Sequence, residues 1–136
     1  MAEARAIDRR PQVVEAHGRG RVEGWRCQEC RYPIVQPVPR CPECGSAMSR
    51  ATFGPAGVVR ASTCLRVRVP GYQPPYAIAY VDLEDGPRVL VHSDGDVPLP
   101  LGARVFVTGT TAEGDIAVRE AGAAGEESAC PFMSME

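Results

Sequence analysis

The sequence predicts a mainly β protein in which a short N-terminal helix and a metal-binding ribbon precede a small five-stranded barrel. Three observations predict this fold class. Two C-x-x-C pairs lie close together in the first third of the chain, apolar and polar residues alternate after residue 51, and Gly- and Pro-rich turns divide that region into five segments. A chain of 136 residues accommodates one domain of about 100 residues and a small appendage.

The first part, residues 1–22, is expected to contain the short helix. The segment of residues 11–17 begins with Pro11, and Gly18 and Gly20 follow it. Proline at the beginning of a segment and glycine just past its end are typical of a helix. Because its apolar content is low, this helix would need a partner surface to remain folded.

The second part, residues 23–50, contains two C-x-x-C pairs formed by Cys27, Cys30, Cys41 and Cys44. Each pair places two thiolates on one tight turn, and a hairpin between the turns brings all four sulfurs around a zinc ion, at about 2.3 Å from it. Four thiolates leave no position for water or substrate, so the predicted zinc is structural. The expected module is a rubredoxin-like zinc ribbon.

Two alternatives to zinc stay open, namely iron in a rubredoxin-like site and a dithiol redox pair. A redox pair needs only one C-x-x-C, and zinc is the commoner ion in closed four-thiolate sites of the cytosol. Since so short a ribbon buries little apolar surface, metal binding should supply its folding free energy, for which about 10–16 kcal/mol is available in zinc-finger peptides.

The third part, residues 51–120, has the period of two that is typical of strands. In the first expected strand the odd positions from Val59 to Val69 are mostly apolar, and the even ones include Arg60, Arg66 and Arg68. Such a small barrel is best matched by the OB-fold, a five-stranded Greek-key barrel. The expected strands are residues 58–69, 76–84, 88–93, 103–108 and 115–119. Residues 121–136 are expected to be a flexible C-terminal tail.

The charge balance argues against a nucleic-acid-binding module, the main alternative for an OB barrel joined to a zinc ribbon. The chain has 15 basic residues, all arginine, and 17 acidic ones, and only eight of its residues are aromatic. The sequence also contains no apolar run of about 20 residues that would span a membrane. We therefore expect a soluble cytoplasmic protein that binds neither nucleic acid nor membranes, whose cysteines hold metal and not disulfides.

The order of these elements resembles the acyl-CoA-associated zinc-ribbon/OB-fold accessory proteins over about residues 12–120. Arg31 departs from the family pattern, which commonly has glycine at that point of the first C-x-x-C turn, and the tail around Cys130 has no counterpart. The stretches that carry the resemblance are WRCQEC (25–30), PRCPECGS (39–46), GVVRAST (57–63), PGY (70–72), PYAIAYVDL (75–83), EDGPR (84–88) and LGARV (101–105).

Members of this family are small subunits that pair with thiolase-superfamily proteins, and some accompany hot-dog-fold enoyl-CoA hydratases. The resemblance therefore implies a non-catalytic subunit of an enzyme that makes or cleaves a carbon–carbon bond in an acyl-CoA. It implies a heterotetramer of two plus two subunits, with the coenzyme A thioester as a ligand shared with the partner. A purely structural adaptor without ligand contact is a further alternative.

Catalysis by the chain alone is not expected, because Cys64 and Cys130 are its only cysteines outside the zinc set and His17 and His92 its only imidazoles. Binding is the remaining role. Arginine side chains suit the phosphates of coenzyme A, and the loop of residues 71–76 could line a channel for the acyl group. A solvated strand face and a stiff surface loop are the alternative. The candidate acyl-CoA contacts are Arg60, Arg66, Arg68, Tyr72 and Tyr76.

Overall fold

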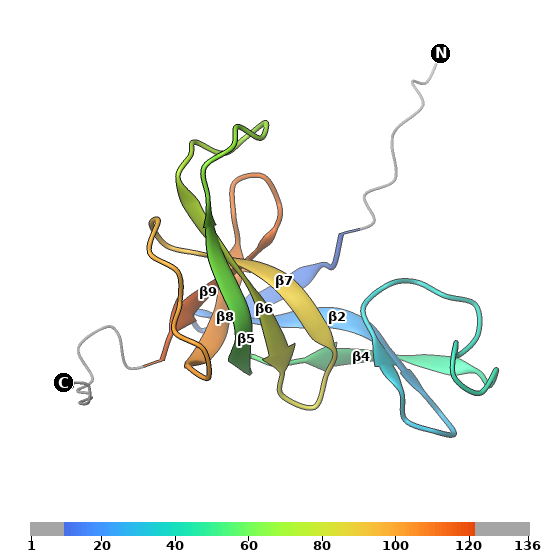
Figure 1. Cartoon of the computed structure of the whole chain (residues 1–136). Helices are drawn as coiled ribbons and strands as arrows, with labels where there is room; N and C mark the ends of the chain where they lie inside the picture. Colours follow the sequence, from blue (N-terminus) through green and yellow to red (C-terminus); the bar gives the residue numbers. More distant parts are fainter. Residues whose placement is uncertain (1–9, 122–136) are drawn as a thin grey trace, which may run out of the picture.

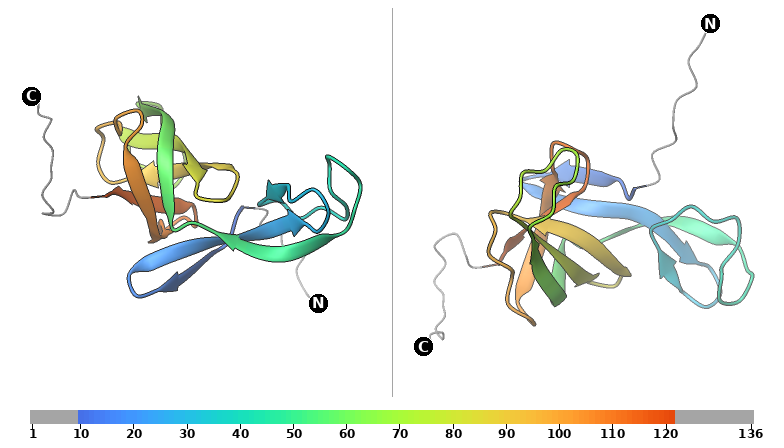
Figure 2. Two further views of the ribbon diagram at one scale, coloured as in Figure 1. Left: turned by 90° about the horizontal axis from the view of Figure 1, so that it is seen from below. Right: turned by 45° about the horizontal axis from the view of Figure 1, so that its top comes forward.

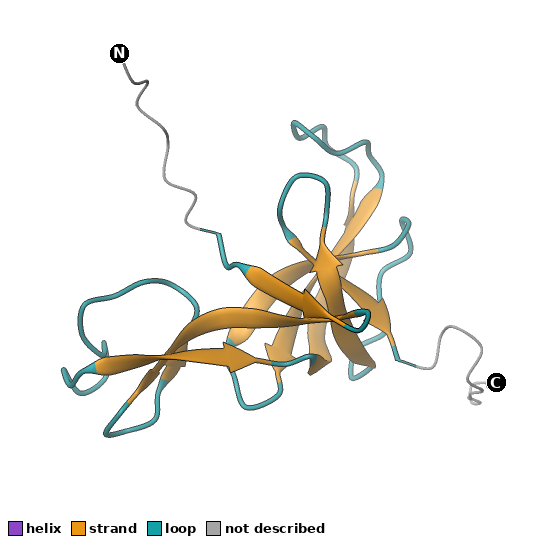
Figure 3. Ribbon diagram, turned by 180° about the vertical axis from the view of Figure 1, so that it is seen from behind, coloured by secondary structure: helices purple, strands orange, loops and turns teal. Residues whose placement is uncertain are grey.

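The structure, a computed structural model, describes residues 10–121 and consists of a four-stranded sheet joined to a closed five-stranded barrel (Figure 1). The predicted tail, residue 121 apart, lies outside the described residues. Residues 10–121 contain no helix (Figure 3), and thus none that could cross a membrane. The strands are β1 (Val13–Ala16), β2 (Arg19–Cys27), β3 (Pro33–Ile34), β4 (Met48–Phe53), β5 (Ala56–Leu65), β6 (Tyr76–Leu83), β7 (Arg88–Ser93), β8 (Arg104–Thr110) and β9 (Ile116–Glu120).

The predicted N-terminal helix is wrong, because its residues form strand β1, which pairs antiparallel with β2. Ala16 lies opposite Arg19, and the two residues between them, His17 and Gly18, have φ angles of 55° and 77°. A two-residue turn with both φ angles positive matches the twist of a β-hairpin. The glycine expected to end a helix is therefore the second turn residue of a hairpin.

The ribbon sheet is organised around β2, which pairs with β1, β3 and β4. Gly24 lets these elements approach closely, because a Cβ at this position would lie 2.4 Å from the carbonyl oxygen of Ile34 and 2.8 Å from Phe53. Strands β2 and β4 run across the predicted part boundaries after residues 22 and 50. The two strands form an arm that extends away from the barrel (Figure 2).

The barrel has the strand order β5-β6-β7-β9-β8 and closes through pairing of β5 with β8. Strand β7 pairs in parallel with β9, and the other barrel pairs are antiparallel. Renumbered from the first barrel strand, this order is 1-2-3-5-4, that of a five-stranded OB barrel. The predicted mainly β fold with a five-stranded barrel is confirmed.

Strand β5 departs from its predicted pattern because its register with β6 shifts between Val59 and Ala61. The extra residue at this bulge reverses which side chains face inward. Ala61 is exposed opposite Tyr80, whereas Cys64 is half-buried opposite the buried Ala77. The strand also ends at Leu65, so the expected continuation to residue 69 is a loop.

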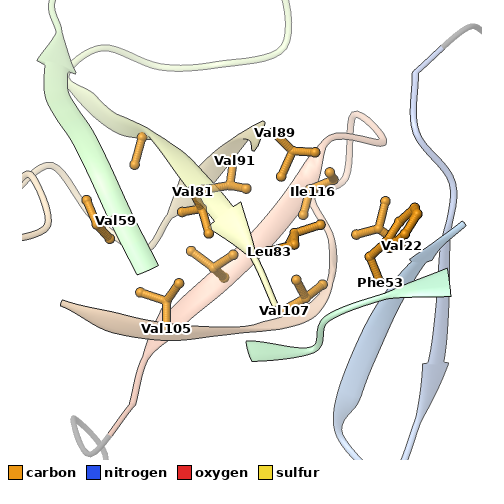
Figure 4. Packing of buried hydrophobic residues seen from close by; sticks show 12 residues of the cluster. Val22, Phe53, Val59, Val81, Leu83, Val89, Val91, Val105, Val107 and Ile116 are labelled. Carbon is orange, nitrogen blue, oxygen red and sulfur yellow. The ribbon is translucent and has the colours of Figure 1, made fainter. Parts of the chain in front are cut away.

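One hydrophobic core joins the barrel to the ribbon sheet. Val22 from β2 and Phe53 from β4 are fully buried, and they belong to the same cluster as barrel residues such as Val107 (Figure 4). Phe53 also packs against Gly86, where a Cβ would lie 2.7 Å from Phe53 Cβ and 2.8 Å from its ring. The root of the two-stranded arm is therefore fixed to the barrel, and its far end carries the cysteine turns.

Candidate functional site

The four predicted metal ligands lie together at the far end of the ribbon. The Sγ atoms of Cys27, Cys30, Cys41 and Cys44 all lie within 4.8 Å of one another. Cys27 Sγ is 3.4 Å from Cys44 Sγ, and Cys30 Sγ is 3.6 Å from Cys41 Sγ. A tetrahedron with metal–sulfur bonds of about 2.3 Å has sulfur–sulfur edges of about 3.8 Å. The cluster therefore fits a single tetrahedral metal ion.

The two C-x-x-C turns repeat the same backbone geometry. The N–H of Arg31 donates to the carbonyl oxygen of Cys27 at 3.2 Å, and the N–H of Gly45 donates to that of Cys41 at 2.9 Å. Arg31 and Gly45 both have positive φ angles, 70° and 81°. Arg31 thus adopts the left-handed conformation that glycine takes in the second turn, so its departure from the family pattern leaves the turn unchanged.

Backbone N–H groups donate hydrogen bonds to two of the four sulfurs and orient them. Those of Glu29 and Cys30 donate to Cys27 Sγ, and that of Glu43 donates to Cys41 Sγ, each at 3.3 Å. Hydrogen bonds from the hydroxyl and backbone N–H of Ser46 lower the pKa of Cys44 to about 6.

Cys30 shows why the set needs a cation. The backbone N–H of Tyr32 lowers the pKa of Cys30, but burial and the three other sulfurs of the cluster oppose it and raise the pKa to about 12. Four thiolates so close together repel one another, and a bound metal ion removes that repulsion. The donor set thus favours a thiophilic metal ion over four free thiols.

The structure does not place the three candidate arginines on one strand face. Arg60 Nε donates to Asp82 Oδ2 at 2.8 Å, and Arg88 Nε donates to Asp82 Oδ1 at 2.7 Å. The hydrogen bond from Arg88, together with Arg60, lowers the pKa of Asp82 to about 2. Arg66 and Arg68 are exposed in the loop that follows β5. Arg60 is therefore part of an ion-pair triad, whereas the two loop arginines project into solvent.

The two candidate tyrosines form an aromatic stack with His92. The ring centroids of Tyr72 and His92 are 4.5 Å apart with an interplanar angle of 11°, and those of Tyr72 and Tyr76 are 5.2 Å apart. Tyr76 is buried at the start of β6, and His92 lies near the end of β7. The stack fastens the loop of residues 66–75 to the barrel wall.

Asp115, which the sequence predicted as the first residue of a strand, connects this loop to a second loop, residues 111–115. The Tyr72 hydroxyl donates to Asp115 Oδ2 at 2.5 Å and lies 2.7 Å from Thr111 Oγ1. Arg10 contacts the opposite carboxylate oxygen at 3.3 Å. We call Tyr72, Thr111 and Asp115 the interloop latch. In OB-folds the loops between strands 1 and 2 and between strands 4 and 5 bind ligands, and the latch joins those two loops.

The electrostatics of the latch follow from its burial. Burial, and then the hydrogen bond to the Asp115 carboxylate, raises the pKa of Tyr72, so its hydroxyl stays protonated as a donor. Burial lowers the pKa of His92, although Asp115, 3.7 Å from Nε2, opposes the shift. At neutral pH the stack therefore contains a neutral imidazole beside the neutral Tyr72 ring.

The latch predicts that Tyr72→Phe will loosen the loop of residues 66–75. Removing one hydrogen bond to a partly exposed carboxylate should reduce the free energy of unfolding by about 1 kcal/mol. Amide exchange in the loop should become about fivefold faster, the factor that corresponds to this free energy. The matched control is Tyr80→Phe, because Tyr80 is 51% exposed on the barrel wall. Equal loop exchange in both variants would show that the latch does not order the loop.

The remaining candidates have no such arrangement. Cys64 is half-buried on β5, and His17 is exposed in the turn between β1 and β2. Cys130 lies outside the described residues. Of the candidates within residues 10–121, the structure brings together the four cysteines and the two tyrosines, and it leaves Arg66 and Arg68 exposed in the latched loop.

Comparison with known proteins agrees with this architecture. Residues 51–110 match the family described as the C-terminal OB-fold domain of ChsH2. The chain is also similar to a solved structure described as an Ltp2-ChsH2(DUF35) aldolase, with 26% sequence identity and a TM-score of 0.61 over 74% of this chain and 85% of that chain. No curated protein matches the chain significantly. The resemblance predicted from the sequence is confirmed: residues 51–110 are similar to the OB-fold domain of ChsH2, and the chain is similar to a solved structure described as containing ChsH2.

Proposed function

We propose that this chain is a non-catalytic subunit of a heteromeric thiolase-like enzyme, in which it helps to form the acyl-CoA site and stabilises the complex. The observation that carries the proposal is its similarity, over 74% of its length, to a structure described as an aldolase of Ltp2 and ChsH2. The reaction is the formation or cleavage of a carbon–carbon bond, and the partner subunit supplies its nucleophile and bases. A two-plus-two heterotetramer is the assembly expected for such a pair.

The metal in this proposal is one structural zinc ion held by Cys27, Cys30, Cys41 and Cys44. Support comes from four sulfurs at tetrahedral spacing and from backbone N–H groups directed at them. Bound zinc would neutralise the thiolates and fix the two turns to each other. It would leave no open position for substrate, so its role is to shape the ribbon end of the subunit.

The acyl-CoA contacts in this proposal are the exposed Arg66 and Arg68, with Tyr72 and Tyr76 holding their loop. Guanidinium groups pair well with phosphates, and coenzyme A carries several. Arg60 is a weaker candidate because Asp82 already accepts its hydrogen bond. The thioester would be shared, with its phosphates on this chain and its reacting carbonyl in the partner.

Purification from the native host and kinetics of the reconstituted complex test this function. The tagged chain should co-purify with a larger thiolase-like protein and should show no turnover on acyl-CoA without it. In the complex, Arg66→Ala should raise the Michaelis constant for acyl-CoA about 3- to 10-fold, the loss expected for one exposed phosphate contact. A sizing column should show intact assembly.

Arg50→Ala is the matched control, because Arg50 lies on the ribbon strand β4 and pairs with Glu23. Its Michaelis constant should equal that of the unmodified complex. Equal Michaelis constants for Arg66→Ala and Arg50→Ala would show that Arg66 does not contact the acyl-CoA and would support a purely structural adaptor. If the partner enzyme works at full rate without this chain, the chain is not a required subunit.

A further inference from the structure

A groove of about 890 Å³ lies at the end of the barrel where the chain leaves the described residues, and the proposed function does not use it. The residues that line it come from the loop between β7 and β8 on one side and mainly from β8, β9 and the start of β2 on the other. Ala121, the last described residue, is part of its wall. The side chains that give the groove its character are Arg19, Val97, Leu99, Arg104, Phe106 and Arg119.

The groove combines an apolar surface with guanidinium groups. Val97 is 73% exposed, and the guanidinium of Arg19 stacks 4.0 Å above the ring of Phe106. Arg104 is exposed, and Arg119 pairs with the exposed Asp94 at 3.3 Å. Exposed apolar side chains beside arginines suit a segment that is both apolar and acidic.

We propose that this groove binds the C-terminal segment of the same chain, residues 122–136. This segment has three acidic residues, Glu126, Glu127 and Glu136, and no basic residue. Its large apolar residues are Phe132, Met133 and Met135. The composition complements the arginines and the apolar wall of the groove.

The attachment of residues 122–136 at Ala121, in the wall of the groove, favours their binding there. The N–H of Ala121 donates to the carbonyl oxygen of Arg104 at 2.8 Å, so the segment starts beside the side chain that would bind its carboxylates. Phe132 can lie up to about 37 Å from Ala121 in an extended chain, which is ample for a return to the groove. Because the segment is attached at Ala121, its effective concentration at the groove is of the order of millimolar, so weak contacts suffice for occupancy.

A small anionic ligand with an apolar part has the same chemistry, but it would need its own binding free energy against the tethered segment. Binding of the segment would cover Val97 and Leu99 in the free chain. This inference does not depend on the proposed acyl-CoA contacts, which lie on the loop of residues 66–75.

Nuclear magnetic resonance of the full-length chain tests the proposal directly. Nuclear Overhauser effects are expected between the ring protons of Phe132 and the methyl groups of Val97 or Leu99. Phe132→Ala should shift those methyl resonances, and the control Ser128→Ala should leave them unchanged. Absence of the Overhauser effects, together with unshifted methyl resonances in Phe132→Ala, would overturn the proposal.

Charge reversal and rescue test the electrostatic part in the same chain. Arg104→Glu should weaken the Overhauser effects at least twofold, and adding Glu126→Arg and Glu127→Arg should restore them. Failure of the rescue, in variants whose far-ultraviolet circular dichroism is unchanged, would contradict the charge pairing. A titration with adenosine diphosphate is the last measurement. If it shifts the Val97 and Leu99 methyl resonances equally in the unmodified chain and in Phe132→Ala, a free anion occupies the groove and the segment does not.

Discussion

Replacing Cys41 by serine should abolish metal binding and disorder the cysteine turns. The sulfur at this position is buried and accepts a backbone hydrogen bond within the cluster. Removing one of four ligands forfeits most of the metal's contribution, which amounts to about 10–16 kcal/mol in zinc-finger peptides. Elemental analysis should therefore fall from one zinc per chain to a small fraction of one.

The loss should be confined to the far end of the ribbon, because Val22 and Phe53 hold the other end of β2 and β4 in the barrel core. Circular dichroism should keep most of its strand signal. The matched control is Cys64→Ser, which changes a half-buried cysteine outside the cluster and should retain the full metal content. Iron throughout the unmodified protein would contradict the choice of zinc, and loss of all strand signal in Cys41→Ser would show that the barrel depends on the metal.

Phe53→Ala should destabilise the whole described fold. The side chain is fully buried where β4 meets the barrel, and truncation of such a phenylalanine costs about 3–5 kcal/mol through lost transfer free energy and the cavity left behind. In a chain of this size the midpoint of thermal unfolding should fall by about 10 °C or more. Urea unfolding followed by circular dichroism would measure the change in free energy.

Leu90→Ala is the control for Phe53→Ala. Leu90 is 46% exposed on the outer wall of the barrel, so its truncation should cost less than about 1 kcal/mol. A similar loss in both variants would contradict the joint core. If Phe53→Ala destabilises only the ribbon sheet, the barrel folds independently of that sheet.

The barrel and the cysteine cluster were predictable from the sequence because their signals are local. Residues 88–93 were expected to be a strand and form β7 without adjustment, since turn residues flank an alternating segment. The four cysteines are recognisable by spacing alone. In both cases the residues that specify the structure are neighbours in the chain.

The parts that were not predicted depend on ambiguous or distant signals. A glycine after residues 12–17 is compatible with a helix end or a hairpin turn, and pairing with β2 decides between them. The bulge after Val59 adds one residue to the strand and reverses which side chains face the barrel interior, and no residue type in the sequence indicates it. Asp115 is 43 positions from Tyr72, so the latch exists only once the barrel has closed.

The shared core limits how this protein can recombine with others. Val22 precedes the cysteine turns and Phe53 follows them, yet the two side chains pack in one cluster with the barrel. A crossover at residue 22 or 50 would place Val22 against a foreign barrel and leave an unfilled space beside Phe53 in this one. Exchange of only the segment between Gly24 and Arg50, which contains the cysteine turns, would keep Val22 and Phe53 together with the barrel.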